Sequence, residues 1–312
     1  MAENFEREHS NMEWMYAETD FALHTVILWL TGADRLSLFL EVIDELRGLG
    51  IAVEALLAEE TAPVKKEALY ITDSGTCAEW LRRQKLPVLA YLHEDNRAGD
   101  FAGIRYGMEQ PWDISADYLE RIYRRYTNRP WEILCTERCR LRETTVEDVD
   151  GFVEMYKAPG ITKFTEKLYD DPEQEKAYVR EYIEKVYGYY EYGVWSVLWK
   201  ETGELIGRAG FSERGGYDLP ELGFVIALPW QGKGIATEIC QAILQYGEEY
   251  LGFEAVQALV RPENTSSLAL CKKLGFTMVG RVREPDHVTG ISHEYCHLVW
   301  KAERASQIHG SN

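Results

Sequence analysis

The stretch Leu222–Tyr250, LGFVIALPWQGKGIATEICQAILQYGEEY, decides the fold of the second half of the chain. An apolar run ends at Pro229, two glycines follow at positions 232 and 234, and a long amphipathic stretch begins at Ile235. Glycines between a strand and a helix let the backbone approach a ligand closely, because they lack a Cβ. The stretch therefore predicts a strand, an anion-binding turn and a helix, in that order.

Two familiar nucleotide-binding loops do not fit this turn. A Walker-type loop needs Ser or Thr directly after Gly-Lys, whereas Lys233 is followed by Gly234, and the upstream glycine is missing. A dinucleotide fingerprint needs a third small residue where Thr237 stands, and it opens a unit of parallel strands. The runs before this turn instead predict consecutive hairpins, with a tight turn at Thr202-Gly203.

The second part of the chain predicts a mixed sheet. Strands are expected at residues 138–143, 193–201, 203–213, 221–228, 255–260, 276–284 and 293–301, and helices at residues 146–156, 173–190, 235–251 and 266–275. This order, with antiparallel hairpins before the glycine turn, is typical of an α/β (α+β) domain with a mixed sheet rather than of a doubly wound one.

Residues 138–300 resemble the GNAT superfamily of N-acetyltransferases. The pattern Gln231-x-x-Gly234-x-Ala236, between a strand and an amphipathic helix, is similar to the pyrophosphate-binding signature of that family. The following PENTSSLALCKKLGF is similar to its next motif, and the opening RLRETTVEDV looks most like the Rim-type branch of ribosomal-protein N-terminal acetyltransferases. The resemblance implies a GNAT-like acetyltransferase fold with acetyl-CoA as the cosubstrate and no metal.

The resemblance also implies where coenzyme A binds. The first turn of a helix presents unpaired N–H groups and the positive end of a dipole, which suit a pyrophosphate. The strand around Val225 would pair with the pantetheine arm, and Asn264 would cap its helix and reach a pantetheine amide. The expected cofactor-binding residues are Phe224, Val225, Ile226, Gln231, Gly232, Lys233, Gly234, Ile235, Ala236, Thr237, Asn264 and Ser267.

Acetyl transfer to an amine needs a group that takes the amine proton and one that protonates the leaving thiolate. Glu221 is the candidate base, although it also reads as an exposed carboxylate at a strand end, and Glu213 is the reserve. The related family keeps a Tyr where this chain has Cys271. A thiol, with an ordinary pKa of about 8.5, could donate the proton, but Cys271 shares a helical face with Leu268 and Leu274, which favours core packing. Glu221 and Cys271 are therefore the expected catalytic residues.

The first part, residues 1–132, predicts a small Rossmann-like three-layer α/β domain with a mainly parallel sheet, followed by a second domain over residues 133–312. A break at Asn128-Arg129-Pro130 separates the two. The run from Tyr70 to Asn96 is similar to the later half of the haloacid-dehalogenase-like fold, with Asp73 where that family keeps an acidic loop. The Asp-x-Asp-x-Thr loop of that family does not follow the first strand, and Asp148-Val149-Asp150 reads as a helix start. We therefore expect this domain to lack catalytic residues.

Composition limits the partners. The 312 residues are 46% hydrophobic and 28% charged, and their net charge of −18 argues against nucleic-acid binding. No apolar run reaches the ~18 residues of a membrane span, and the N-terminus does not read as a signal peptide. The six cysteines predict free thiols in a reducing cytoplasm, and Cys135 and Cys139 lack the further ligands that a metal site needs.

These features predict a cytoplasmic N-acetyltransferase that moves an acetyl group from acetyl-CoA to a primary amine by direct attack. The acceptor is expected to be an amine-bearing small molecule or a peptide N-terminus, and a homodimer is left open. The alternative is a non-catalytic CoA-binding regulatory or interaction protein, which the cysteine in place of the tyrosine favours.

Overall fold

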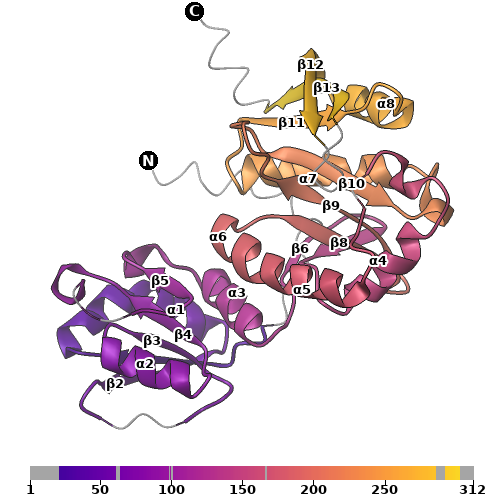
Figure 1. The fold of residues 1–312 in the computed structure, drawn as a ribbon. Helices are drawn as coiled ribbons and strands as arrows, with labels where there is room; N and C mark the ends of the chain where they lie inside the picture. The colour runs from indigo at the N-terminus through magenta and orange to yellow at the C-terminus, as the bar shows by residue number, and fades with distance from the viewer. Residues whose placement is uncertain are drawn as a thin grey trace, which may run out of the picture. The chain divides into compact units, whose positions relative to one another are not determined.

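The computed structural model describes residues 21–302, except residues 61–63, 98, 100, 166 and 286–291. These residues divide into two compact units, one ending at Trp131 and the other beginning at Glu132. Each unit has a sheet of its own (Figure 1). The two units are described separately below.

The first unit is built on a five-stranded sheet in the order β2-β1-β3-β4-β5, and every neighbouring pair is parallel, as expected. Its strands are β1 (Thr25–Leu30), β2 (Ala52–Leu57), β3 (Leu69–Thr72), β4 (Val88–Tyr91) and β5 (Tyr106–Met108). Its helices are α1 (Leu40–Gly48), α2 (Gly75–Arg83) and α3 (Ala116–Tyr126), with 3-10 turns at Ala33–Phe39, Glu94–Asn96 and Pro111–Asp113.

The alternation of side chains along β1 explains why both faces of this sheet are covered. Val26 and Leu28 belong to the core that α1 and α3 share with one face. Ile27 and Trp29 point to the other face, where they pack with Leu81 of α2. The unit therefore has three layers.

Asp73 lies directly after β3, at the carboxyl edge of the parallel sheet, and is 1% exposed. Its carboxylate accepts hydrogen bonds from the backbone N–H of Thr31 at 2.7 Å and from the Thr31 hydroxyl at 2.6 Å. Arg35 Nε lies 3.2 Å away and His93 Nε2 lies 3.4 Å away. The acidic side chain that the sequence indicated is thus held by three side chains of its own unit.

The second unit is built on an eight-stranded sheet in the order β12-β13-β11-β10-β9-β8-β7-β6. Its strands are β6 (Glu132–Cys135), β7 (Cys139–Arg142), β8 (Val194–Trp199), β9 (Leu205–Ser212), β10 (Glu221–Ile226), β11 (Ala255–Val260), β12 (Thr277–Pro285) and β13 (Ser292–Lys301). Only β10 and β11 pair in parallel among these described strands. The sheet is therefore mixed, as the sequence predicts.

The helices of this unit begin and end close to the expected positions. They are α4 (Asp148–Tyr156), α5 (Pro172–Tyr182), α6 (Gly188–Tyr190), α7 (Ile235–Glu249) and α8 (Thr265–Lys273), with 3-10 turns at Ile161–Lys163 and Leu228–Trp230. The predicted helix 173–190 is one departure, because a π-helical turn over Ile183–Tyr187 separates α5 from α6. The helix start predicted at Asp148 is confirmed.

Aromatic packing fixes α7 against the sheet. Trp195 of β8 is fully buried, and its ring centroid lies 6.1 Å from that of Phe211 on β9 and 5.7 Å from that of Tyr246 on α7. Both ring pairs meet edge to face, the arrangement that aromatic quadrupoles favour. The C-terminal half of α7 is thereby packed against β8 and β9.

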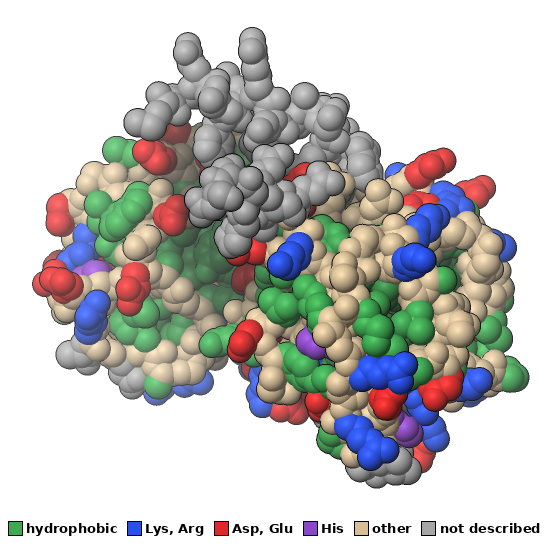
Figure 2. Space-filling model, turned by 90° about the horizontal axis from the view of Figure 1, so that it is seen from above, with side chains coloured by type: hydrophobic (Ala, Val, Ile, Leu, Met, Phe, Trp, Pro, Cys, Tyr) green, Lys and Arg blue, Asp and Glu red, His purple; other side chains and the backbone are tan. Residues whose placement is uncertain are grey.

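The surface and the cysteines give further limits. Figure 2 shows acidic and basic side chains interspersed with apolar ones over the face that it presents. None of the described helices is both long and apolar enough to cross a membrane. All six cysteines are buried free thiols, and the described residues hold no cluster of three or more potential metal ligands.

Candidate active site

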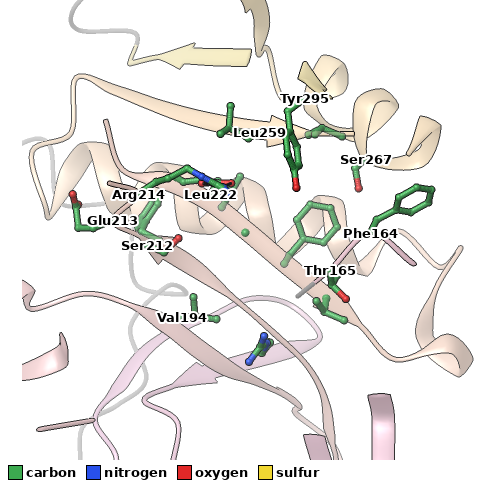
Figure 3. Close-up of a pocket in the computed structure, with 18 of the residues that line it drawn as sticks. Phe164, Thr165, Val194, Ser212, Glu213, Arg214, Leu222, Leu259, Ser267 and Tyr295 are labelled. Atoms are coloured by element: carbon green, nitrogen blue, oxygen red, sulfur yellow. Dashed lines mark hydrogen bonds and ion pairs between the residues drawn. The ribbon is translucent and has the colours of Figure 1, made fainter. Parts of the chain in front are cut away.

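A cavity of about 740 Å³ opens in the second unit, between the middle of its sheet and the segment from α5 to α6 (Figure 3). It brings together several of the residues that the sequence indicated, although they come from different elements. These are Glu221, Phe224 and Val225 of β10, Asn264 at the start of α8, and Ser267 and Cys271 of α8. The residues of the glycine turn, Gln231 to Thr237, lie outside the lining of this cavity, as does Ile226.

The cavity exists because β10 and β11 separate. The two strands share a single register pair, Glu221 with Gln257, whereas β10 stays paired with β9 along its whole length. Beyond Glu221 the edge of β10 that faces β11 therefore has no strand beside it. An unpaired strand edge presents backbone N–H and C=O groups to a ligand.

The glycine turn has the backbone that an anion site needs. Gly232 and Gly234 have φ angles of 73° and 80°, which side chains with a Cβ rarely adopt. Gly234 is the N-cap of α7, and no side chain caps the helix, so the first-turn amides are left for a ligand. The positive end of the helix dipole acts at the same place. Ile235, Ala236 and Thr237 form this first turn.

Two side chains hold the turn in place. Gln231 Nε2 donates to the carbonyl of Ile226 at 2.7 Å and so ties the turn to the end of β10. Arg138 donates to the backbone carbonyl of Lys233 at 3.0 Å and pairs with Glu238 of α7. Burial raises the pKa of Glu238, but hydrogen bonds from Thr136 and Arg138 outweigh it and lower the pKa below its ordinary value. The sequence did not predict this role of Arg138, because Arg138 lies far from the glycine turn in the chain.

Asn264 caps α8 as predicted. Its Oδ1 accepts from the backbone N–H of Ser267 at 3.2 Å and from the Ser266 hydroxyl at 3.0 Å. Asn264 and Ser267 both line the cavity, and Figure 3 shows the Ser267 hydroxyl near its α8 wall. The cap thus places polar atoms beside the opened strand edge.

Glu221, the candidate base, forms a well-shielded ion pair. Arg214 Nη1 lies 3.0 Å from Glu221 Oε2, and the two side chains are 13% and 16% exposed. The Arg214 guanidinium also lies 5.8 Å from the ring centroid of Tyr295. Glu221 is therefore a held carboxylate within the cavity rather than a free strand-end acid.

Cys271, the candidate acid, is 2% exposed and forms part of the cavity wall. Burial raises the pKa of its thiol to about 11, so the sulfur keeps its proton at neutral pH. Burial, and then the nearby Cys271 thiol, raises the pKa of Cys240 of α7. Both features fit a thiol packed against α7, and the protonated state also fits a proton donor.

Other cavity residues escaped the sequence. Tyr295 of β13 lines the cavity, and Figure 3 shows its hydroxyl directed inward, on the side of Ser267. Tyr192 donates a hydrogen bond to Glu213, the reserve base, and burial followed by this bond raises the pKa of the Tyr192 phenol. Glu213 lies at the opposite end of the cavity from Tyr295 in Figure 3. Tyr295 reaches the cavity through the pairing of strands that are distant in the chain, so no local motif marks it.

Comparison with known proteins identifies this unit. The family model for the acetyltransferase (GNAT) domain matches residues 138–277. The uncharacterized N-acetyltransferase p20 of Bacillus licheniformis is 31% identical over 166 residues, which cover 51% of this chain and 90% of the relative. The chain belongs to the GNAT acetyltransferase family. It is accordingly an N-acetyltransferase, with acetyl-CoA as the acetyl donor.

Other GNAT proteins are more distantly similar to this one. The ribosomal protein uS5-alanine N-acetyltransferase of Escherichia coli is 34% identical over 83 residues, which cover 26% of this chain and 43% of the relative. A solved GNAT-family acetyltransferase from Bacillus anthracis is 22% identical, covers 55% of this chain and 98% of its own, and has a TM-score of 0.46. The match to the GNAT domain lies outside the first unit, so the haloacid-dehalogenase-like resemblance there stays an expectation.

Proposed function

We propose that the acceptor is a primary amine of a small molecule or of a peptide N-terminus, and that it attacks the donor directly inside the cavity. The observation that carries this proposal is the separation of β10 from β11, which opens the cavity beside Glu221 and Cys271. An acceptor in the cavity and a thioester along β10 would meet without an enzyme-bound acetyl group. The N-terminal acetyltransferases among the relatives support the peptide acceptor.

The residues present fit coenzyme A. When bound, acetyl-CoA supplies an activated acetyl thioester. The left-handed glycines leave the first-turn amides of α7 uncapped, which suits a pyrophosphate. We assign this role to Gly232, Lys233, Gly234, Ile235, Ala236 and Thr237, with Gln231 holding the turn.

The pantetheine arm is assigned to the open strand edge. Phe224, Val225 and Ile226 would offer it backbone groups, and Asn264 and Ser267 would contact it from the facing helix. The carbonyl of Ile226 already accepts a hydrogen bond from Gln231, so Phe224 and Val225 carry most of this contact. A backbone N–H on this edge would also polarise the thioester carbonyl.

Glu221 is assigned as the proton acceptor for the amine. Its ion pair with Arg214 at 3.0 Å fixes the carboxylate in place. A carboxylate in the cavity can take the amine proton, directly or through a water molecule.

Cys271 is assigned as the proton donor to the leaving thiolate, because it lies in the cavity wall and carries its proton at neutral pH, although its raised pKa makes it a weaker acid than an ordinary thiol. Tyr295 is the second candidate for this step. The inward direction of its hydroxyl favours it, because a donor must reach the reacting atoms.

A panel of primary amines tests the proposal. Release of free coenzyme A is followed with each amine, and the acetylated product is identified by mass spectrometry. We expect at least one amine to stimulate release in proportion to enzyme concentration. Binding of coenzyme A with no release from any amine of a broad panel would instead support the non-catalytic alternative.

A further inference from the structure

Arg208 is a half-buried side chain of the cavity wall whose charge the proposed chemistry does not use. It extends from β9, where it pairs in register with Val225 of β10. Its guanidinium carbon lies 5.2 Å from the ring centroid of Tyr156 and 5.8 Å from that of Phe152, both on α4. Rings can cover the flat faces of a guanidinium, but the N–H donors in its plane remain for another partner.

Within the described part of the chain, Arg208 forms no ion pair. Of the five other cations that line the cavity, three have a carboxylate nearby, whereas Lys163 and Lys167 form no ion pair with a described residue. Arg214 pairs with Glu221 at 3.0 Å, and Lys185 pairs with Glu181. Arg261 lies 3.8 Å from Glu263. A guanidinium keeps its charge at every physiological pH, and partial burial without an anion costs free energy.

The charge of the cavity wall is opposite to that of the chain. Six of the lining side chains are Lys or Arg and three are Glu, whereas the whole chain has 52 acidic and 34 basic residues. A local surplus of positive charge within an acidic protein attracts anions to that place and repels cations. The cavity is thus not arranged for a polyamine.

We propose that Arg208 binds an anionic group, a carboxylate or a phosphate, that the acceptor carries in addition to its amine. This inference rests on the proposed function, because it concerns the acceptor of the same site. The pyrophosphate of coenzyme A is assigned to the glycine turn before α7, outside the cavity lining. The ribose phosphate lies on the far side of the pyrophosphate from the pantetheine arm, and that arm is uncharged. The anion at Arg208 therefore comes from the acceptor. A planar guanidinium can bind either group through two parallel hydrogen bonds.

Three matched pairs of acceptors test this inference and separate the sources of the anion. They are L-alanine with L-alaninamide, O-phosphoethanolamine with ethanolamine, and an amidated tripeptide with Asp at its second position against the same peptide with Asn. The ratio of kcat/KM within each pair is measured for the wild type and for Arg208→Met, which keeps an apolar stem on the rings of Phe152 and Tyr156. Comparing the two enzymes cancels the intrinsic reactivity of each amine.

For at least one pair we expect the preference for the anionic acceptor to fall about 10- to 100-fold in Arg208→Met, the range that a hydrogen-bonded charge provides. Arg208→Lys should retain part of it. Arg281→Met is the matched control, since Arg281 is an exposed arginine of β12, paired with Glu294 and outside the cavity lining. Its ratios should equal those of the wild type. Partial misfolding does not change a ratio, because both acceptors meet the same folded molecules.

Ratios that are equal in the wild type and in Arg208→Met for all three pairs would overturn the inference. If the wild type acetylates none of the six probes, the proposed function is not supported for these acceptors. The anion site is then tested separately, by measuring the affinity for one anionic probe. Calorimetry of O-phosphoethanolamine with the CoA-saturated protein should show an affinity at least tenfold weaker in Arg208→Met. Equal affinities, or no binding to the wild type, would overturn the inference.

Discussion

At the scale of single residues, Gly234 is a position where both the backbone conformation and the proposed ligand require the absence of a side chain. Its φ of 80° disfavours any side chain, and a Cβ there would lie 3.7 Å from Arg138 Nη2, beside the first turn of α7. We expect Gly234→Val to weaken CoA binding at least 100-fold, measured by calorimetry, because a branched side chain strains the turn and covers its amides.

Gly203 provides the control for this substitution. It has a φ of 74° in the turn between β8 and β9, with open space where a Cβ would lie and no part in the cavity. Gly203→Val should cost a similar free energy of unfolding and leave the affinity for coenzyme A unchanged. An unchanged affinity in Gly234→Val would remove the pyrophosphate from this turn.

The proton donor is also a question of single residues. We expect one of the two variants Cys271→Ala and Tyr295→Phe to lower kcat by about 100-fold, since general acid catalysis contributes roughly 10²- to 10⁴-fold. The other should change kcat little. Single-turnover rates check this, because they separate chemistry from product release. If neither variant slows transfer, water protonates the thiolate, and Cys271 is a core residue.

At the scale of elements, the cap of α8 joins stability to the site. Asn264→Ala should lower the free energy of unfolding by about 1 kcal/mol, because the N–H of Ser267 loses its acceptor. Urea denaturation measures this change. Asn264→Asp keeps the cap and should be nearly as stable as the wild type, but it lacks the amide donor. Weaker CoA binding in Asn264→Asp, whose cap and stability are retained, would then assign the amide to the ligand.

Most elements could be predicted from periodicity, because each strand and helix has a buried face. The π-helical turn Ile183–Tyr187 could not be, since one extra residue per turn hardly alters an apolar pattern over a few positions. It matters for the site, because Lys185 and Val186 of this turn, with Tyr182 and Tyr190 beside it, line the cavity. The sequence does not show which of the aromatic side chains around this turn face inward.

The site was predictable where the chemistry lies in one segment and not where strands far apart in the chain meet. The glycine turn and the Asn264 cap are local patterns, so their backbone roles follow from residue type and spacing. The approach of Tyr295 to Arg214 depends on strand order across the sheet, because β13, which carries Tyr295, lies far from Arg214 in the chain. Nothing in the spacing of those residues indicates that they share a cavity.

At the scale of the whole molecule, the first unit holds an ionic cluster that the acetyltransferase site does not need. Asp73→Asn should destabilise this unit by about 3 kcal/mol, because the buried carboxylate that pairs with Arg35 and accepts from Thr31 is lost. Thermal and urea unfolding measure the loss. Asp95→Asn is the control, since Asp95 also pairs with Arg35 but its side chain is 80% exposed. Equal stability of both variants would show that the cluster is not structural.

The hairpin β6–β7 has a practical consequence for anyone who wishes to isolate the catalytic half. The family match begins at Arg138. The Arg138 side chain, which donates a hydrogen bond to the glycine turn, extends from the bend between these two strands, close to Thr136. A fragment that begins at the family boundary would lack β6, and Arg138 would then be its first residue, without the paired strand that positions it. A fragment of the second unit should therefore begin before Glu132, the first residue of β6, rather than at the start of the family match.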